Sequence, residues 1–111
     1  MTRNEILKNE LLRIVDIIKT KDHPLKIILF GSLAGNNTHE WSDIDLAVIK
    51  ESKSKFSHRI YELLNLIKPK YSINILVYTP EEVQYLEKNK NYFWENEICK
   101  KGKVLYAEQV A

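Results

Sequence analysis

Two short groups of residues, separated by ten positions, are the part of this sequence best suited to chemistry. Gly31 and Ser32 follow an apolar run at residues 27–30, and Asp43 and Asp45 come next in an otherwise apolar segment. A glycine lets backbone N–H groups approach an anion closely, and the serine hydroxyl adds a donor. Two neighbouring carboxylates repel each other unless a cation lies between them, and Mg²⁺ prefers such oxygen ligands. Together the groups predict a site for the phosphates of a nucleotide and their Mg²⁺.

Each group has a simpler explanation when taken alone. A Gly-Ser pair is most often a turn, and Asp-x-Asp is most often a solvated strand end. In this chain, however, Asp43 and Asp45 alternate with apolar residues in the segment 43–49, so both carboxylates fall on one face of a predicted strand. A purely structural strand gains nothing from two acids on the same face, which favours the functional interpretation.

Hydrophobic periodicity predicts the elements that position these residues. We expect helices over 4–21, 56–67 and 92–101, a further helix beginning at Pro80 with Thr79 as its N-cap, and strands over 25–30, 43–49, 72–78 and 104–106. The last strand is expected at the edge of the sheet, and Gly102 closes the last helix. This order predicts an α/β (α+β) fold, a small mixed sheet flanked by helices. The whole chain, residues 1–111, is expected to form a single domain with the site at one end of the first two strands.

Composition limits the classes of partner. The chain is 44% apolar and 29% charged with a net charge of +2, so we expect a folded protein without a basic stripe for nucleic acid. No apolar run approaches the roughly 20 residues of a membrane span. The single cysteine, Cys99, excludes an intrachain disulfide and is expected in or near the core. These features predict a soluble, cytoplasmic protein.

The spacing Gly31-Ser32, ten residues, then Asp43-x-Asp45 resembles the signature of the DNA polymerase β-type nucleotidyltransferase superfamily. The short chain and the segments 42–46, 75–82 and 98–106 resemble its minimal nucleotidyltransferase (MNT) branch. The resemblance implies the nucleotidyltransferase fold, ATP as the substrate, nucleotide binding by Gly31 and Ser32, and Mg²⁺ binding by Asp43 and Asp45.

MNT proteins are commonly paired with HEPN-domain proteins in toxin–antitoxin systems. There the MNT protein is the antitoxin, and active members transfer AMP from ATP to a tyrosine of the toxin. The resemblance therefore implies a helical HEPN-domain partner and a possible hetero-oligomer.

One residue departs from the family pattern at the third strand. The family carries a third carboxylate there, and the matching residue of this chain is Asn74. An amide oxygen ligates a metal weakly and cannot accept the proton of an attacking hydroxyl. Asn74 is therefore a weakened third member of the catalytic set with Asp43 and Asp45, or a residue that only hydrogen-bonds within its strand.

Other residues have weaker claims on the site. Leu33 and Gly35 stand where family members often carry arginines, and Trp41 replaces a polar residue before Ser42. Three lysines after the second strand could compensate for the missing charge or form a solvated cluster: Lys50, Lys53 and Lys55. His39 could reach a phosphate, and Glu81 or Glu82 could replace the third acid, although both glutamates are explained as first-turn helix residues.

Two functions follow from this pattern. The first is an MNT-type enzyme that transfers AMP to a protein partner. The second is a catalytically degenerate MNT module that acts on a HEPN-domain protein by binding alone. A transferase acting on nucleic acid is less consistent with the nearly balanced charge.

Overall fold

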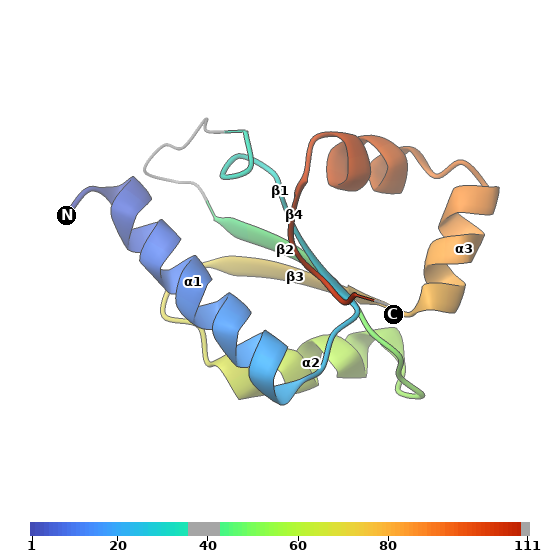
Figure 1. Cartoon of the computed structure of the whole chain (residues 1–111), viewed down its shortest axis with the longest axis horizontal. Helices are drawn as coiled ribbons and strands as arrows, with labels where there is room; N and C mark the ends of the chain where they lie inside the picture. The colour runs from blue at the N-terminus through green and yellow to red at the C-terminus, as the bar shows by residue number, and fades with distance from the viewer. Residues whose placement is uncertain (36–42, 110–111) are drawn as a thin grey trace.

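A computed structural model describes residues 1–35 and 43–109 of the chain, in which helices cover both faces of a four-stranded sheet (Figure 1). The predicted residues His39, Trp41 and Ser42 lie outside this described part. The predicted elements are all present, with bounds that differ by a residue at most. In chain order they are α1 (Arg3–Lys21), β1 (Lys26–Phe30), β2 (Ile44–Ile49), α2 (Phe56–Ile67), β3 (Ile73–Tyr78), α3 (Pro80–Lys88), the π-helix η1 (Phe93–Lys100) and β4 (Lys103–Ala107).

The sheet is mixed, with the strand order β3-β2-β1-β4. β1 runs antiparallel to both β2 and β4, whereas β2 and β3 are parallel and are joined through α2. The C-terminal end of β1 and the N-terminal ends of β2 and β3 therefore lie at the same end of the sheet (Figure 1). The prediction of a small mixed sheet with β4 at its edge is confirmed.

Each face of the sheet packs against its own pair of helices. Alternate residues of β2 divide between the two faces, as their period of two predicts. The face toward α1 and α2 forms the larger core, which includes Leu7, Leu11, Ile14, Ile18, Ile27, Leu29, Ile44, Leu46, Val48, Leu63, Ile67, Ile75 and Val77. The face toward α3 and η1 forms a smaller core of Ile28, Phe30, Ala47, Ile49, Trp94 and Ile98. Asp45 shares the parity of Ala47 and Ile49, so it belongs to the face of the smaller core.

Local sequence signals set the helix ends. The Thr2 hydroxyl accepts a hydrogen bond from the Glu5 N–H and caps α1. Thr79 and Glu82 form the predicted capping box at the start of α3, with Pro80 at the first helical position. The expectation for Cys99 was wrong, because this residue lies on the exposed side of η1.

A buried arginine joins α2, β3 and α3. Arg59 of α2 is 6% exposed, and its guanidinium donates two hydrogen bonds to the Glu82 carboxylate at 2.7 and 2.8 Å. It also donates to the backbone carbonyl oxygens of Val77 and Ser54. Glu82 is thereby occupied at the C-terminal end of β3, far from the N-terminal end where Asn74 lies. The hypothesis that Glu82 replaces the missing third acid is not supported.

Candidate active site

Gly31 brings the end of β1 into direct contact with the first residues of β2. Its φ angle is +73°, in the left-handed region that favours glycine. A Cβ atom on Gly31 would lie 2.1 Å from Oδ2 of Asp45, so the absence of a side chain lets the carboxylate pack against the backbone. Backbone hydrogen bonds from Ala34 to Gly31 and from Gly35 to Ser32, each 3.2 Å, close the turn that follows. The Gly31–Ser32 turn and the acidic segment that begins β2 are thus brought together at one end of the sheet.

The parallel register of β2 and β3 places Asn74 directly beside Asp45. Nδ2 of Asn74 donates a hydrogen bond to Oδ1 of Asp45 at 2.8 Å. The contact crosses from β3 to β2 and does not stay within one strand, and such a hydrogen bond is consistent with either of the two predicted roles of Asn74. Asn74 therefore lies beside Asp45 and presents an N–H₂ donor to it.

The environment of Asp45 disfavours a negative charge. Burial raises the pKa of the Asp45 carboxyl above its ordinary value, and the nearby negative charge of Asp43 raises it further. The hydrogen bond from Asn74 opposes both effects. Asp43 lies just before β2 and is half-buried. A bound cation would relieve the remaining repulsion between the two acids, which is the electrostatic pattern expected of a metal site.

The donor set of the described residues fits one hard cation. Asp43 and Asp45 offer carboxylate oxygens, which Mg²⁺ prefers, and Asn74 offers at most an amide oxygen. Over residues 1–35 and 43–109, no cluster of three or more His, Cys, Asp or Glu side chains is placed to hold a metal ion. The described residues therefore suit a single Mg²⁺ shared with phosphate oxygens, and among them no third acid is placed beside this pair for a second cation.

An open pocket of about 540 Å³ lies against the turn after β1. It is lined by Gly31, Ser32, Gly35, Glu97 and Lys101, so residues from the far end of the sequence contribute to it. The sequence analysis missed Glu97 and Lys101. Their spacing of four residues in a helix indicates an ion pair, but nothing in the sequence tells which part of the fold that pair faces.

The lysines that could have compensated for the missing arginines lie elsewhere. β2 begins near Asp45 and ends at Ile49. Lys50 follows at the opposite end of the sheet, about 16 Å from Asp45 at the usual rise per residue. There Nζ of Lys50 pairs with the Asp22 carboxylate at 2.8 Å. Lys53 and Lys55 come later in the same loop. The structure therefore gives no support to a phosphate-binding role for these three lysines.

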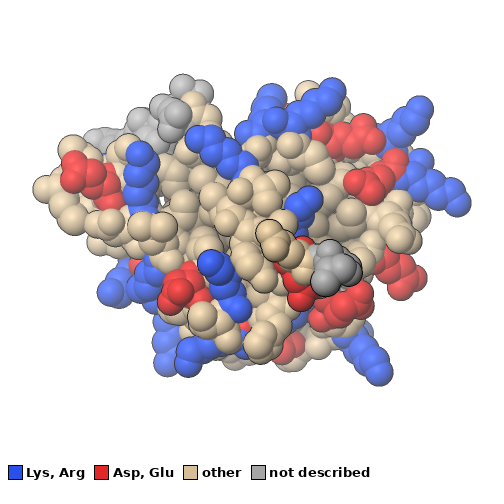
Figure 2. Space-filling model, in the orientation of Figure 1, with Lys and Arg blue, Asp and Glu red and all other residues tan. Residues whose placement is uncertain are grey.

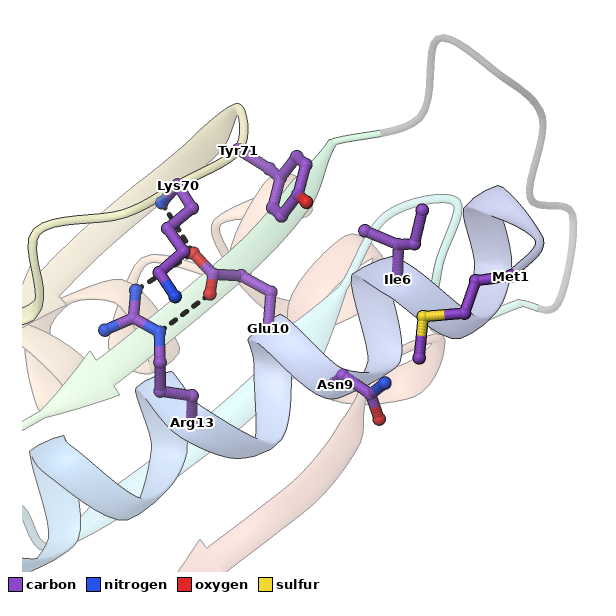
Figure 3. Close-up of a pocket in the computed structure, with 7 residues that line it drawn as sticks. All are labelled: Met1, Ile6, Asn9, Glu10, Arg13, Lys70 and Tyr71. Carbon is purple, nitrogen blue, oxygen red and sulfur yellow. Dashed lines mark hydrogen bonds and ion pairs between the residues drawn. The ribbon is translucent and has the colours of Figure 1, made fainter.

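A second hollow, of about 220 Å³, lies beside α1 and is lined by Met1, Ile6, Asn9, Glu10, Arg13, Lys70 and Tyr71 (Figure 3). Its carboxylate is already occupied, because Glu10 accepts hydrogen bonds from the Arg13 guanidinium at 2.7 and 3.0 Å and from the Lys70 N–H at 2.6 Å. Arg13 also donates to the carbonyl oxygen of Ile67 at 2.9 Å. This cluster joins α1 to the end of α2, and we assign it a structural role.

The visible surface carries both signs of charge. Figure 2 shows Lys and Arg side chains interspersed with Asp and Glu over this face, without a continuous basic stripe. The described helices also lack the combination of length and apolarity that crossing a membrane requires.

Comparison with known proteins adds two similarities. The sequence profile of the family described as "Polymerase beta, Nucleotidyltransferase" matches residues 13–110. The fold is similar to the crystal structure of a Sulfolobus solfataricus protein that carries the provisional name of nucleotidyltransferase, with a TM-score of 0.66 and 16% sequence identity over 95% of this chain and 84% of that chain. No curated protein matches the sequence. At this identity the structural likeness shows a shared fold alone.

Proposed function

The chain belongs to the polymerase beta nucleotidyltransferase family, and on this premise we propose that it binds Mg²⁺–ATP and transfers AMP to a HEPN-domain protein, as the antitoxin of a toxin–antitoxin pair. One observation carries the proposal. Asp45 lies between Gly31 and Asn74 at one end of the sheet: its Oδ2 packs against the Gly31 backbone and its Oδ1 accepts a hydrogen bond from Asn74, while Gly31 also lines an open pocket.

The chain's own residues have separate roles in this proposal. The backbone of Gly31 and the hydroxyl of Ser32 would bind phosphate oxygens, and Asp43 and Asp45 would hold Mg²⁺, whose charge would offset that of the phosphates. Asn74 now turns its N–H₂ group toward Asp45. A half-turn of the amide would present its oxygen instead and convert a hydrogen-bond donor into a weak metal ligand.

The transfer step forms one bond and breaks one. The hydroxyl oxygen of the acceptor bonds to the α-phosphorus of ATP, the bond from that phosphorus to the oxygen bridging to the β-phosphorus breaks, and pyrophosphate leaves. The hydroxyl proton passes to water, because Asn74 cannot accept it. General-base assistance is worth on the order of 10²–10⁴-fold in rate. We therefore expect transfer to be slow relative to nucleotide binding.

The same residue favours a second candidate function. Asn74 donates a hydrogen bond to one oxygen of Asp45, which favours the charged carboxylate beside Asp43 without a bound cation, and Asn74 cannot act as a general base. In this alternative the protein retains the nucleotide site but neutralises its HEPN-domain partner by binding alone.

Exposed aromatic side chains support a protein partner in either case. Tyr85 and Tyr92 are each 68% exposed and Phe93 is 44% exposed, all on α3, on η1 or between them. Aromatic residues are enriched at protein interfaces. The neighbouring Trp94 is buried and belongs to the core, so it contributes nothing to this surface.

The test is AMP transfer from ATP labelled at the α-phosphate, with Mg²⁺ and, as the acceptor, a HEPN-domain protein, taken from beside this gene if one is encoded there. The unaltered chain is compared with Asn74→Asp and Asp45→Asn, and with Asp16→Asn as a control that removes one exposed acid from α1. Binding of Mg²⁺–ATP to each variant is measured in parallel by calorimetry.

Each outcome separates the two functions. Label on the partner with the unaltered chain, lost in Asp45→Asn and kept in Asp16→Asn, supports the enzyme. Label only with Asn74→Asp supports the binding module with an intact nucleotide site. Absence of Mg²⁺–ATP binding at millimolar nucleotide would reject the nucleotide site in both versions.

A further inference from the structure

We propose that Lys101 binds the phosphate tail of the nucleotide in the pocket beside Gly31 and Ser32, and that Glu97 restrains this lysine until the nucleotide displaces it. The inference rests on the proposed nucleotide site and adds to it the cation that the turn after β1 lacks. It also predicts that Glu97 weakens nucleotide binding.

The turn after β1 forms one side of the pocket and carries no positive charge to bind phosphate. A nucleoside triphosphate keeps net negative charge even with one Mg²⁺ bound, and phosphate sites usually include Lys or Arg. The turn after β1 offers only neutral groups, because Leu33 and Ala34 are buried apolar residues. Among the described residues that line the pocket, Lys101 is the basic side chain.

The fold fixes the backbone of Lys101 while leaving its side chain largely exposed to solvent. Gly102 follows directly, and a Cβ there would lie 2.1 Å from the carbonyl oxygen of Ile98 and 2.8 Å from Cγ2 of Ile28 in β1. The end of η1 is therefore pressed closely against β1, the strand that leads into the Gly31–Ser32 turn. The Lys101 side chain is 66% exposed, so it can reorient toward a ligand in the pocket.

Glu97 is placed to oppose this role. Its carboxylate oxygen Oε1 lies 3.1 Å from Nζ of Lys101, one helical turn away, and Glu97 lines the same pocket. An exposed ion pair of this kind is weak, so phosphate oxygens can compete for the lysine. The carboxylate also repels the phosphates directly. Glu97 should therefore lower nucleotide affinity, mainly by holding Lys101.

The test is a titration of Mg²⁺–ATP by calorimetry into the unaltered chain, Lys101→Met, Glu97→Gln and the double variant. Lys100→Met is the matched control, because it removes the same charge from an exposed neighbouring residue that does not line the pocket. We expect Lys101→Met to weaken binding about tenfold, as for loss of a charged hydrogen bond, and Lys100→Met to change it less than about twofold. Glu97→Gln should strengthen binding by about threefold, and this gain should largely disappear in the double variant.

The outcomes distinguish this inference from the proposed function. If the unaltered chain binds Mg²⁺–ATP and Lys101→Met binds it equally well, the nucleotide site stands and the role of Lys101 is rejected. If Glu97→Gln strengthens binding equally with and without Lys101, Glu97 acts by repulsion alone and the restraint is rejected. If the unaltered chain does not bind, the proposed function fails and this inference fails with it. Thermal unfolding of each variant checks that the fold is retained.

Discussion

Gly31→Ala should disrupt the site through one identified contact. An alanine at this position would place its Cβ 2.1 Å from Oδ2 and 3.0 Å from Cγ of Asp45, far inside van der Waals distance. It would also have to adopt the φ angle of +73° that glycine tolerates. Asp45 would have to rotate away, and its 2.8 Å hydrogen bond with Asn74 would break. We therefore expect the substitution to destabilise the fold and to weaken Mg²⁺ binding together.

The magnitude has two parts. A non-glycine residue in the left-handed region costs about 1–2 kcal/mol, and this cost is independent of Asp45. Displacement of the carboxylate and loss of a partly exposed hydrogen bond to it cost about 1 kcal/mol more. Gly31→Ala should thus lower the free energy of unfolding by about 2–3 kcal/mol. In an Asp45→Ala background only the first part should remain.

A double-mutant cycle measured by urea unfolding separates the two parts. The unaltered chain, Gly31→Ala, Asp45→Ala and the double variant are compared by circular dichroism. We expect a coupling of about 1 kcal/mol between the two substitutions, with the double variant more stable than the sum of the single changes predicts. Additivity within about 0.3 kcal/mol would refute the contact between Gly31 and Asp45 and the reasoning built on it.

Three further predictions concern charge. Asn74→Asp should lower stability by about 1 kcal/mol without metal, because it places a like charge beside Asp45, and excess Mg²⁺ should reverse the loss; a melting temperature insensitive to Mg²⁺ would contradict the single-cation site. Glu82→Ala should cost about 2–3 kcal/mol in urea unfolding, because the buried Arg59 loses its carboxylate partner; a loss below about 0.5 kcal/mol would show that water replaces it. The Arg13 guanidinium lowers the pKa of the Glu10 carboxyl from its ordinary value, so the stability from this pair is fully present above that ordinary value and is lost as pH falls through the lowered pKa; Glu10→Gln should flatten stability measured across this acidic range, and an unchanged slope would argue against the pair.

Local signals in the sequence were sufficient for most of the fold. Alternation in β2, the three-and-four spacing of α1 and the Thr79–Glu82 capping box each depend on residues within one element, so they could be recognised without knowledge of the partners. The π form of η1 could not, because eight residues do not separate a period of 3.6 from a slightly wider one.

Part of the candidate site could likewise be predicted from local sequence, and part could not. Gly31, Ser32, Asp43 and Asp45 were identified by residue type and spacing, since they end one strand and begin the next. Lys50, whose role at the site the sequence left open, shows the limit of this reasoning. Lys50 follows Asp45 closely in the sequence, but the extended strand β2 places it at the opposite end of the sheet.

Only the tertiary structure decided what surrounds that core of the site. Asn74 contacts Asp45 because β2 and β3 pair in parallel in one register, and a shift of a single residue would have turned the amide to the other face. Lys101 reaches the pocket because β4 pairs with β1 and draws the end of η1 back to the Gly31 turn. Both contacts join residues far apart in the chain, and they depend on strand pairing that no local pattern of residue types specifies.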